Sequence, residues 1–273
     1  MCNQVGGNDD LVFDGGSFVV SPDGMLGELP LFETGSISID LDGPSCEATL
    51  LSEHEERFKA LVLGTKDYVE KSGHAQAILG ISGGIDSAIV ATIAVSALGR
   101  DAVTGILMPS RYSSLGSVED AEQLAKRLGI KTTTLPIEHM HAAFERTLDD
   151  SCLEATGLAS ENAQARIRGL LLMALANEQG SLVLATGNKS ELAVGYSTLY
   201  GDMNGAVSVI GDVYKTNVWS LARWVNDNFE GCGFENPPIP ESKIPIGSSD
   251  FKYYNFNSFF TNPVISLDSG PLL

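Results

Sequence analysis

The sequence has few basic residues. Lysine and arginine together number 17, against 35 aspartates and glutamates, and the formal net charge is −18 at pH 7. A surface that binds nucleic acid or an anionic membrane needs clustered basic side chains, so this balance argues against both partners. The chain also has no apolar run of membrane-spanning length, and no signal peptide follows Met1. We therefore expect a cytoplasmic protein that contacts neither nucleic acid nor membrane.

Cysteine and histidine are scarce as well. The chain has four cysteines, which are far apart and show no paired spacing: Cys2, Cys46, Cys152 and Cys232. We interpret them as incidental thiols of a reducing compartment, which excludes a disulfide or zinc framework. The pair His139 and His141 has no cysteine or carboxylate partner at metal-ligand spacing, so we expect both at the surface or in the core.

Three segments differ in composition. At 273 residues the chain is long enough for one large domain or for a domain with appendages. Residues 1–50 are rich in glycine and aspartate, and short alternating runs predict strands at 11–13, 17–20 and 36–41. Ser21-Pro22-Asp23-Gly24 predicts a turn between them. Three short strands without a helix bury little core, so this segment is interpreted as the edge of a larger unit.

Residues 51–230 alternate between helical and strand-like patterns. Strands are predicted at 75–81, 103–107, 130–135 and 182–185, with helices at about 58–69, after residue 84, at 117–128 and at about 160–178. Ser117 and Asp120 form a helix-capping signature. The alternation predicts an α/β fold with a doubly wound parallel sheet, which binds ligands at the carboxyl ends of its strands. Residues 231–273 lack periodicity and are predicted to form a divergent, poorly ordered tail.

The strongest functional signal is the run Leu79-Gly80-Ile81-Ser82-Gly83-Gly84-Ile85-Asp86-Ser87. An apolar strand ends in a Ser-Gly-Gly turn, and a buried helix follows at once. The glycines allow a tight turn with exposed N–H groups, and the helix dipole adds positive charge, so the loop suits phosphate or pyrophosphate. Ser82 and Ser87 would hold the anion, and Asp86 would bind the accompanying Mg²⁺. The run has no Walker pattern, and the alternative interpretation is a plain strand-to-helix turn.

Two further polar clusters follow in the same segment. Residues 108–114, directly after a predicted strand, carry Arg111 and several hydroxyls that suit a phosphate or ribose contact. Residues 161–168 place Arg166 and Arg168 at the start of an apolar helix. These arginines are either anion ligands or surface side chains that extend along apolar surface.

The last two clusters lie near the next strand end. Residues 185–191 supply Lys189, a candidate to neutralise a phosphate, and Glu191, a candidate second metal carboxylate beside Asp86. Tyr200-Gly201-Asp202 lies in a glycine-containing loop, and Lys215-Thr216 opens the next helix. Each cluster alone is a weak signal, but three of the clusters are expected at the same edge of one sheet.

Taken in order, these motifs resemble those of NAD⁺ synthetase: Ser-Gly-Gly-Ile-Asp-Ser, Glu-Asn-x-Gln-Ala-Arg-Ile-Arg, Thr-Gly-Asn-Lys-Ser-Glu, Tyr-Gly-Asp and Lys-Thr. The resemblance runs from about Leu50 to Phe229 and implies the ATP pyrophosphatase, or adenine-nucleotide alpha-hydrolase, type of Rossmann-like fold. Residues 3–15 resemble the end of the nitrilase-like glutaminase domain of glutamine-dependent members. The expected organisation is therefore a glutaminase remnant at 1–50, a synthetase domain at 51–230 and the tail at 231–273.

The resemblance implies a two-step ligase reaction. ATP adenylates the nicotinate carboxylate of deamido-NAD (nicotinic acid adenine dinucleotide) with release of pyrophosphate, and ammonia then displaces AMP. The residues carried over as ATP-binding are Ser82, Gly83, Gly84, Asp86, Ser87, Arg166, Thr186 and Lys215. Those carried over for deamido-NAD are Arg168, Lys189, Tyr200 and Asp202. Asp86 and Glu191 would bind Mg²⁺ and, with Lys189, are the expected catalytic residues. Family members pair through this domain, so a homodimer is expected.

Both ends depart from the family pattern. In the family, the nucleophilic cysteine of the glutaminase domain lies well upstream of the motif at residues 3–15. Cys2 comes just before that motif and is therefore too late in the sequence to be the nucleophile. Ammonia rather than glutamine is thus the expected direct nitrogen donor. Residues 237–242 match the approach to a loop that helps close the site, but residues 243–247 do not continue it. The alternative is a truncated, non-catalytic fragment that binds ATP or only dimerises. A GMP synthetase-like or tRNA-modifying pyrophosphatase is disfavoured by the motifs at 186–191 and 200–202, and the acidic charge further disfavours tRNA.

Overall fold

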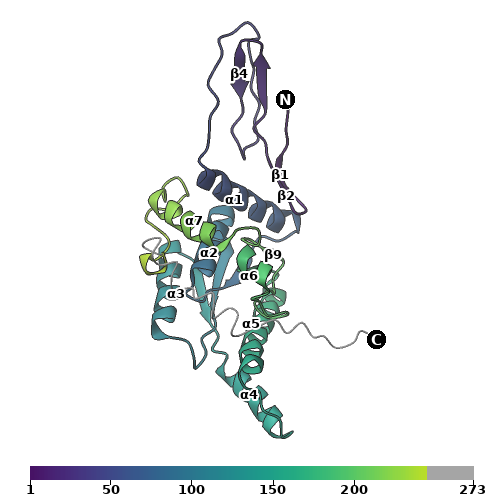
Figure 1. Ribbon diagram of the computed structural model, residues 1–273, viewed down its shortest axis with the longest axis vertical. Helices are drawn as coiled ribbons and strands as arrows, with labels where there is room; N and C mark the ends of the chain where they lie inside the picture. The colour runs from purple at the N-terminus through teal and green to yellow at the C-terminus, as the bar shows by residue number, and fades with distance from the viewer. Residues whose placement is uncertain (245–273) are drawn as a thin grey trace, which may run out of the picture.

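Five parallel strands form the central sheet of residues 1–244, the part of the chain that the computed structural model describes (Figure 1). The strands are β5 (Ala77–Gly80), β6 (Val103–Leu107), β7 (Lys131–Thr134), β8 (Leu182–Ala185) and β9 (Val207–Ser208). Their order is β7-β6-β5-β8-β9, so the chain builds outward from β5 to one edge and then returns to the other side of β5. This topology confirms the predicted doubly wound α/β fold. It places the switch point, where such sheets bind ligands, between β5 and β8.

Helices cover both faces of the sheet. They are α1 (Glu53–Lys71), α2 (Ile85–Leu98), α3 (Leu115–Leu128), α4 (Glu138–Asp149), α5 (Leu158–Gln179), α6 (Lys189–Val194) and α7 (Lys215–Asp227), with short 3₁₀ turns at Arg100–Ala102 and Glu241–Lys243. Successive strand residues face opposite sides. Leu79 of β5 therefore joins a core with α2, α3 and α7, whereas Ile78 joins a smaller core with Leu172 of α5.

Two antiparallel hairpins precede this body. They consist of β1 (Val5–Asn8) with β2 (Leu11–Asp14) and of β3 (Phe18–Ser21) with β4 (Gly24–Glu28). The first hairpin packs on α1, where the main-chain N–H of Gly7 donates to Asp67 Oδ2 at 2.7 Å and Lys71 Nζ donates to the carbonyl of Gly7 at 2.6 Å. The second hairpin projects away from the sheet (Figure 1).

The predicted strands of this segment are confirmed at two of three places. Residues 36–41 form no strand, although they alternate in sequence. Ile37 and Ile39 instead place their side chains over Gly27 of β4, where a Cβ atom would come within 2.9 Å of Ile39 Cδ1. The alternation therefore reflects packing against an existing hairpin and not pairing. Strand β1 is not among the predicted strands, since two of its four residues are glycine.

Two helix predictions need correction. The N-cap of α3 is Ser114, whose hydroxyl accepts from the main-chain N–H of Ser117 at 3.1 Å, and not Ser117 itself. Asp120 takes no part in the cap and accepts a hydrogen bond from Ser242 Oγ at 3.0 Å. Helix α4 is absent from the predicted elements because the residue at its N-terminus, Ile137, carries no capping side chain.

Residues 231–244 do not form a poorly ordered tail. Ile239 is fully buried, and the side-chain amide of Asn226 brackets it by donating to its carbonyl at 2.7 Å and accepting from its N–H at 3.0 Å. Arg127 Nη1 donates to the same carbonyl at 3.2 Å. The rest of the predicted tail, 245–273, lies outside the described residues, and the domain boundaries at residues 50 and 230 stay predictions.

The cysteines and the histidine pair can be located among the described residues. All four cysteines are free, and only Cys232 is buried. His141 is fully buried in the core, as one of the two interpretations of the histidine pair expects. Among residues 1–244 no helix has both the length and the apolar character needed to cross a membrane.

Candidate active site

The Ser-Gly-Gly loop connects β5 to α2 at the carboxyl end of the central strand. Gly83 has a φ of +76°, which disfavours any residue with a side chain, and a Cβ atom there would lie 2.2 Å from the carbonyl oxygen of Ser117. Ser87 Oγ accepts from the main-chain N–H of Ser82 at 3.3 Å and donates to the carbonyl of Gly84 at 3.0 Å. The loop is thus held from within by a hydroxyl and from outside by α3.

Asp86 and Glu191 meet at one buried residue, Asn188. Asp86, in the first turn of α2, accepts from Asn188 Nδ2 at 3.2 Å and forms an ion pair with Lys215 of α7. Glu191 Oε2 accepts from the main-chain N–H of Asn188 at 3.1 Å, and Asn188 Oδ1 accepts from the N–H of Glu191 at 3.0 Å. We call these four residues the carboxylate cluster. Three elements far apart in sequence, the starts of α2, α6 and α7, meet there.

The surroundings of Glu191 disfavour its charged form. Burial raises the pKa of the Glu191 carboxyl, and the negative charge of Asp86 raises it further, while Lys215 acts in the opposite direction. A cation placed between the two carboxylates would relieve this repulsion.

Replacing Glu191 with glutamine is expected to raise the unfolding temperature at pH 7.5. A carboxyl whose folded-state pKa is raised destabilises the fold once it is ionised, and this penalty is absent below the ordinary glutamate pKa of about 4.3. The advantage of Glu191→Gln over the wild type should therefore shrink as the pH falls to 4. Thermal unfolding at both pH values checks this, with the exposed Glu56→Gln as the control. A variant less stable than the wild type at pH 7.5 would contradict it.

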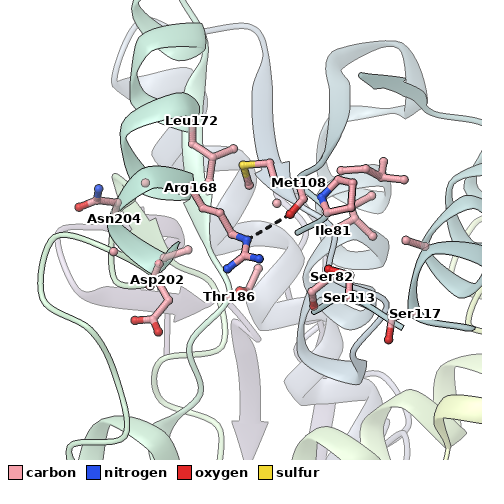
Figure 2. A pocket seen from close by; sticks show the side chains of 18 of the residues that line it. Ile81, Ser82, Met108, Ser113, Ser117, Arg168, Leu172, Thr186, Asp202 and Asn204 are labelled. Atoms are coloured by element: carbon pink, nitrogen blue, oxygen red, sulfur yellow. Dashed lines mark hydrogen bonds between the residues drawn. The ribbon is translucent and has the colours of Figure 1, made fainter. Parts of the chain in front are cut away.

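A cavity of about 430 Å³ opens beside the loop, at the β5–β8 switch point. This volume lies in the range of small-molecule sites. Among the predicted site residues, the cavity is lined by Ser82, Arg168, Thr186 and Asp202. Figure 2 shows the guanidinium of Arg168 reaching into the cavity between Met108 and Thr186, with its Nε donating to the carbonyl of Met108 at 3.2 Å.

The charged groups of the cavity are partly removed from water. Burial lowers the pKa of Arg168, but an arginine stays a cation at neutral pH. Partial burial of its carboxyl raises the pKa of Asp202, although the residue as a whole is exposed, and Asp202 Oδ1 accepts from the N–H of Thr198 at 2.7 Å. The cavity therefore offers a fixed positive charge on one wall and a carboxylate at its rim.

Other predicted residues lie elsewhere in this structure. Lys189 pairs with Asp212, which raises its pKa, and its ammonium lies 5.0 Å from the ring centroid of Tyr214. Arg166 is exposed and donates to the carbonyl of Leu199 at 3.2 Å. Their roles stay predictions.

Two more predicted residues, Arg111 and Tyr200, are not among those that line the cavity. Tyr200 is 71% exposed and has a φ of +62°. Arg111, expected near a phosphate or ribose, bridges Glu138 and Glu145 of α4 at 2.9 and 2.7 Å. The glutamates of a helix that the sequence did not reveal thus hold the arginine.

Sequence reasoning assigns no role to Asn188, the residue that joins the two carboxylates. A signal existed, because asparagine is a preferred N-cap and Glu191 follows it three residues later, as in a capping box. The contact with Asp86, however, depends on the strand order. In residues 1–244 no group of three histidine, cysteine or acidic side chains forms a metal site, so a cation here would need ligands beyond the two carboxylates.

Comparison with known proteins identifies relatives of most of the described chain. Residues 57–244 match a family model described as NAD synthase. A "Glutamine-dependent NAD(+) synthetase" of Synechocystis sp. is 54% identical over 233 residues, which cover 82% of this chain and 42% of the relative. The chain thus spans less than half the length of that relative.

Two solved structures share the fold at substantial identity. The glutamine-dependent NAD⁺ synthetase from Acinetobacter baumannii in complex with ADP has a TM-score of 0.83 at 43% identity, over 92% of this chain and 48% of that one. An NH3-dependent NAD synthetase from Campylobacter jejuni, in complex with nitrate, has a TM-score of 0.62 at 30% identity. That alignment covers 81% of this chain and 89% of that one.

Proposed function

Because the chain belongs to the NAD synthase family, we propose that it catalyses the ATP-dependent amidation of deamido-NAD to NAD, with release of AMP and pyrophosphate. The observation that carries the proposal is the meeting of three features at one switch point: the Ser-Gly-Gly loop, the carboxylate cluster and the cavity that holds Arg168. The ADP complex of the A. baumannii relative supports nucleotide binding by this fold.

The first proposed step activates a poor electrophile. An oxygen of the nicotinate carboxylate attacks the α-phosphorus of ATP, and the bond from that phosphorus to the pyrophosphate oxygen breaks. The products are an acyl adenylate and pyrophosphate. In this proposal the loop from Ser82 to Ser87 and the N-terminus of α2 bind the pyrophosphate, and Lys215 neutralises part of its charge. Arg168 and Thr186 contact the nucleotide or its acyl partner inside the cavity.

Asp86 and Glu191 would hold Mg²⁺ during this step. The ligands available here suit a divalent cation, because two carboxylates that repel each other both contact the buried Asn188. Mg²⁺ is commonly bound by one or two carboxylates together with substrate phosphates, which matches a cluster with no third protein carboxylate. When bound, the ion supplies charge neutralisation for the phosphates. Lys215 then has to leave Asp86 for a phosphate oxygen.

The second proposed step uses ammonia as the direct nitrogen donor. The ammonia nitrogen attacks the acyl carbon, the bond from that carbon to the AMP oxygen breaks, and one proton is released. The C. jejuni relative, named NH3-dependent, supports this donor because the alignment covers most of its length. Positioning and electrostatics supply most of the acceleration in this proposal.

A second hollow next to the cavity gives the reaction room for a second substrate. Its volume is about 580 Å³, and it shares Ser113 and Arg168 with the cavity. Its other walls are mostly polar and include Tyr112, Glu161 and Gln164. We assign the first cavity to ATP and the adjoining hollow to part of deamido-NAD, with Arg168 between them.

We further propose that the chain forms a homodimer through α5 and the loop after α6. Leu170 and Met173 of α5 are 57% and 39% exposed and share a helix face with Arg166, which binds the carbonyl of the 58% exposed Leu199. An apolar face of this kind favours burial against a second copy. The mass in solution should be about twice 28.9 kDa, measured by light scattering. A mass of one chain at micromolar concentration would contradict the dimer.

The test of function is synthesis of NAD by the purified chain. Incubation with deamido-NAD, ATP, Mg²⁺ and ammonium should form NAD, AMP and pyrophosphate in equal amounts. Glutamine in place of ammonium should form none. Nucleotide binding without turnover would instead support a non-catalytic fragment, and activity with glutamine would overturn the assigned nitrogen donor.

A further inference from the structure

Asn188 contacts both acidic residues of the carboxylate cluster, although it carries no charge. It is fully buried, its Nδ2 donates to Asp86 Oδ1 at 3.2 Å, and its main-chain N–H donates to Glu191 Oε2 at 3.1 Å. The other end of the amide is also fixed, because Asn188 Oδ1 accepts from the N–H of Glu191 at 3.0 Å. With the oxygen held by α6, the amide nitrogen must face Asp86.

We propose that Asn188 is a positioning residue that holds Asp86 and Glu191 in the arrangement in which they bind Mg²⁺ together. The inference rests on the proposed function, since it concerns the same two carboxylates. It adds a role for Asn188, an uncharged residue whose printed contacts are to the two carboxylate residues.

Asp86 needs a fixed hydrogen-bond donor because its ion pair with Lys215 is broken when phosphate binds. Lys215 and Asn188 are the two donors that the described structure shows on Asp86. A phosphate that enters the Ser-Gly-Gly loop competes with Asp86 for the Lys215 cation, so the ion pair is the contact that binding breaks. Asn188 cannot turn toward the phosphate in the same way, because its amide oxygen accepts a hydrogen bond from the N–H of Glu191 in α6. Asp86 therefore keeps one fixed donor while its other partner changes.

A purely structural role for Asn188 is the alternative, because the residue also caps α6. The two roles use different ends of the same amide, so substitution separates them. Asn188→Ser keeps a side-chain oxygen that caps the helix nearly as well as asparagine, but it has no amide donor for Asp86. Asn188→Ala removes both contacts.

The experiment measures binding of Mn²⁺, a spectroscopic probe for the Mg²⁺ site, to the full chain with α,β-methylene ATP. Electron paramagnetic resonance gives the Kd of Mn²⁺ directly, without turnover. Loss of a residue that orients metal ligands weakens metal binding by about 10- to 100-fold. We expect this increase in Kd for Asn188→Ser and for Asn188→Ala, whereas only Asn188→Ala should lose substantial thermal stability. Ser52→Ala, which removes the cap of α1, is the matched control and should leave the Kd unchanged.

The outcomes separate this inference from the proposed function. If Asn188→Ser binds Mn²⁺ with the same Kd as the wild type, the positioning role is overturned and Asn188 is only a helix cap. The positioning role is also overturned if the wild-type chain binds no Mn²⁺. Should Asn188→Ser fail to fold, Asn188→Thr, also a capping residue, is expected to show the same weakening. Failure of the wild type to make NAD would overturn the proposed function alone, since the Kd comparison needs no turnover.

Discussion

Gly83→Ala is expected to lower the rate of NAD formation by about 100-fold and to destabilise the fold by more than about 1 kcal/mol. The φ of +76° already disfavours alanine, and the added Cβ would lie 2.2 Å from the carbonyl oxygen of Ser117. A main-chain carbonyl in α3 cannot turn aside as a side chain can, so the loop or the helix has to shift. A shift of the loop moves the N–H groups that are proposed to hold pyrophosphate.

Gly73→Ala is the control that separates the cost of a positive φ from the cost of the steric clash with Ser117. Gly73 has a similar φ of +78°, but a Cβ atom there meets nothing within 4 Å. Gly73→Ala should cost about 1–2 kcal/mol of stability and leave the rate of NAD formation unchanged. The measurements are the rate of NAD formation and the free energy of urea unfolding for both variants. Equal rates for Gly83→Ala and the wild type would show that the loop does not position the reacting phosphates.

Lys215→Met should have a comparably large effect, a fall of about 100- to 1,000-fold in kcat/KM for ATP. Methionine keeps most of the side-chain length but leaves Asp86 without its cation and the proposed pyrophosphate without a neutralising charge. Lys215→Arg should recover part of the rate because it restores the charge, whereas the KM for ammonium should not move in either variant.

The matched control for Lys215→Met is Lys59→Met. Lys59 forms a partly exposed ion pair with Glu55 at 3.0 Å within α1, a contact of little energetic value. Steady-state kinetics with varied ATP compares the two variants. A rate for Lys215→Met within a factor of two of the wild type would remove Lys215 from the proposed mechanism.

The parts of the site that sequence reasoning recovered are those that local rules determine. The strand, the two glycines and the buried helix around residues 77–98 follow from hydrophobic pattern and turn chemistry. The alternation of strands and helices then places the Ser-Gly-Gly loop at a carboxyl end of a parallel sheet. Both inferences need only neighbouring residues and a general rule of topology.

The parts that sequence reasoning missed depend on contacts between distant elements. The joining of Asp86, Asn188 and Lys215 requires the order of β5 and β8 and the return of α7 to the same end. The prediction of a poorly ordered tail was wrong over residues 231–244 for the same reason. Ile239 is held by hydrogen bonds from Asn226 and from Arg127 of α3, and the local sequence pattern does not indicate these contacts. Arg111 was expected at a phosphate because the helix that carries Glu138 and Glu145 lacks a start signal.

Activation of the carboxylate by transfer of AMP is the central claim, and isotope transfer tests it most directly. Deamido-NAD labelled with ¹⁸O in both nicotinate carboxylate oxygens is converted with unlabelled ATP and ammonium, and the products are analysed by mass spectrometry. Attack on the α-phosphorus predicts one ¹⁸O in the phosphate of AMP, one in the amide of NAD and none in pyrophosphate. Label in pyrophosphate or in inorganic phosphate, with unlabelled AMP, would contradict the account.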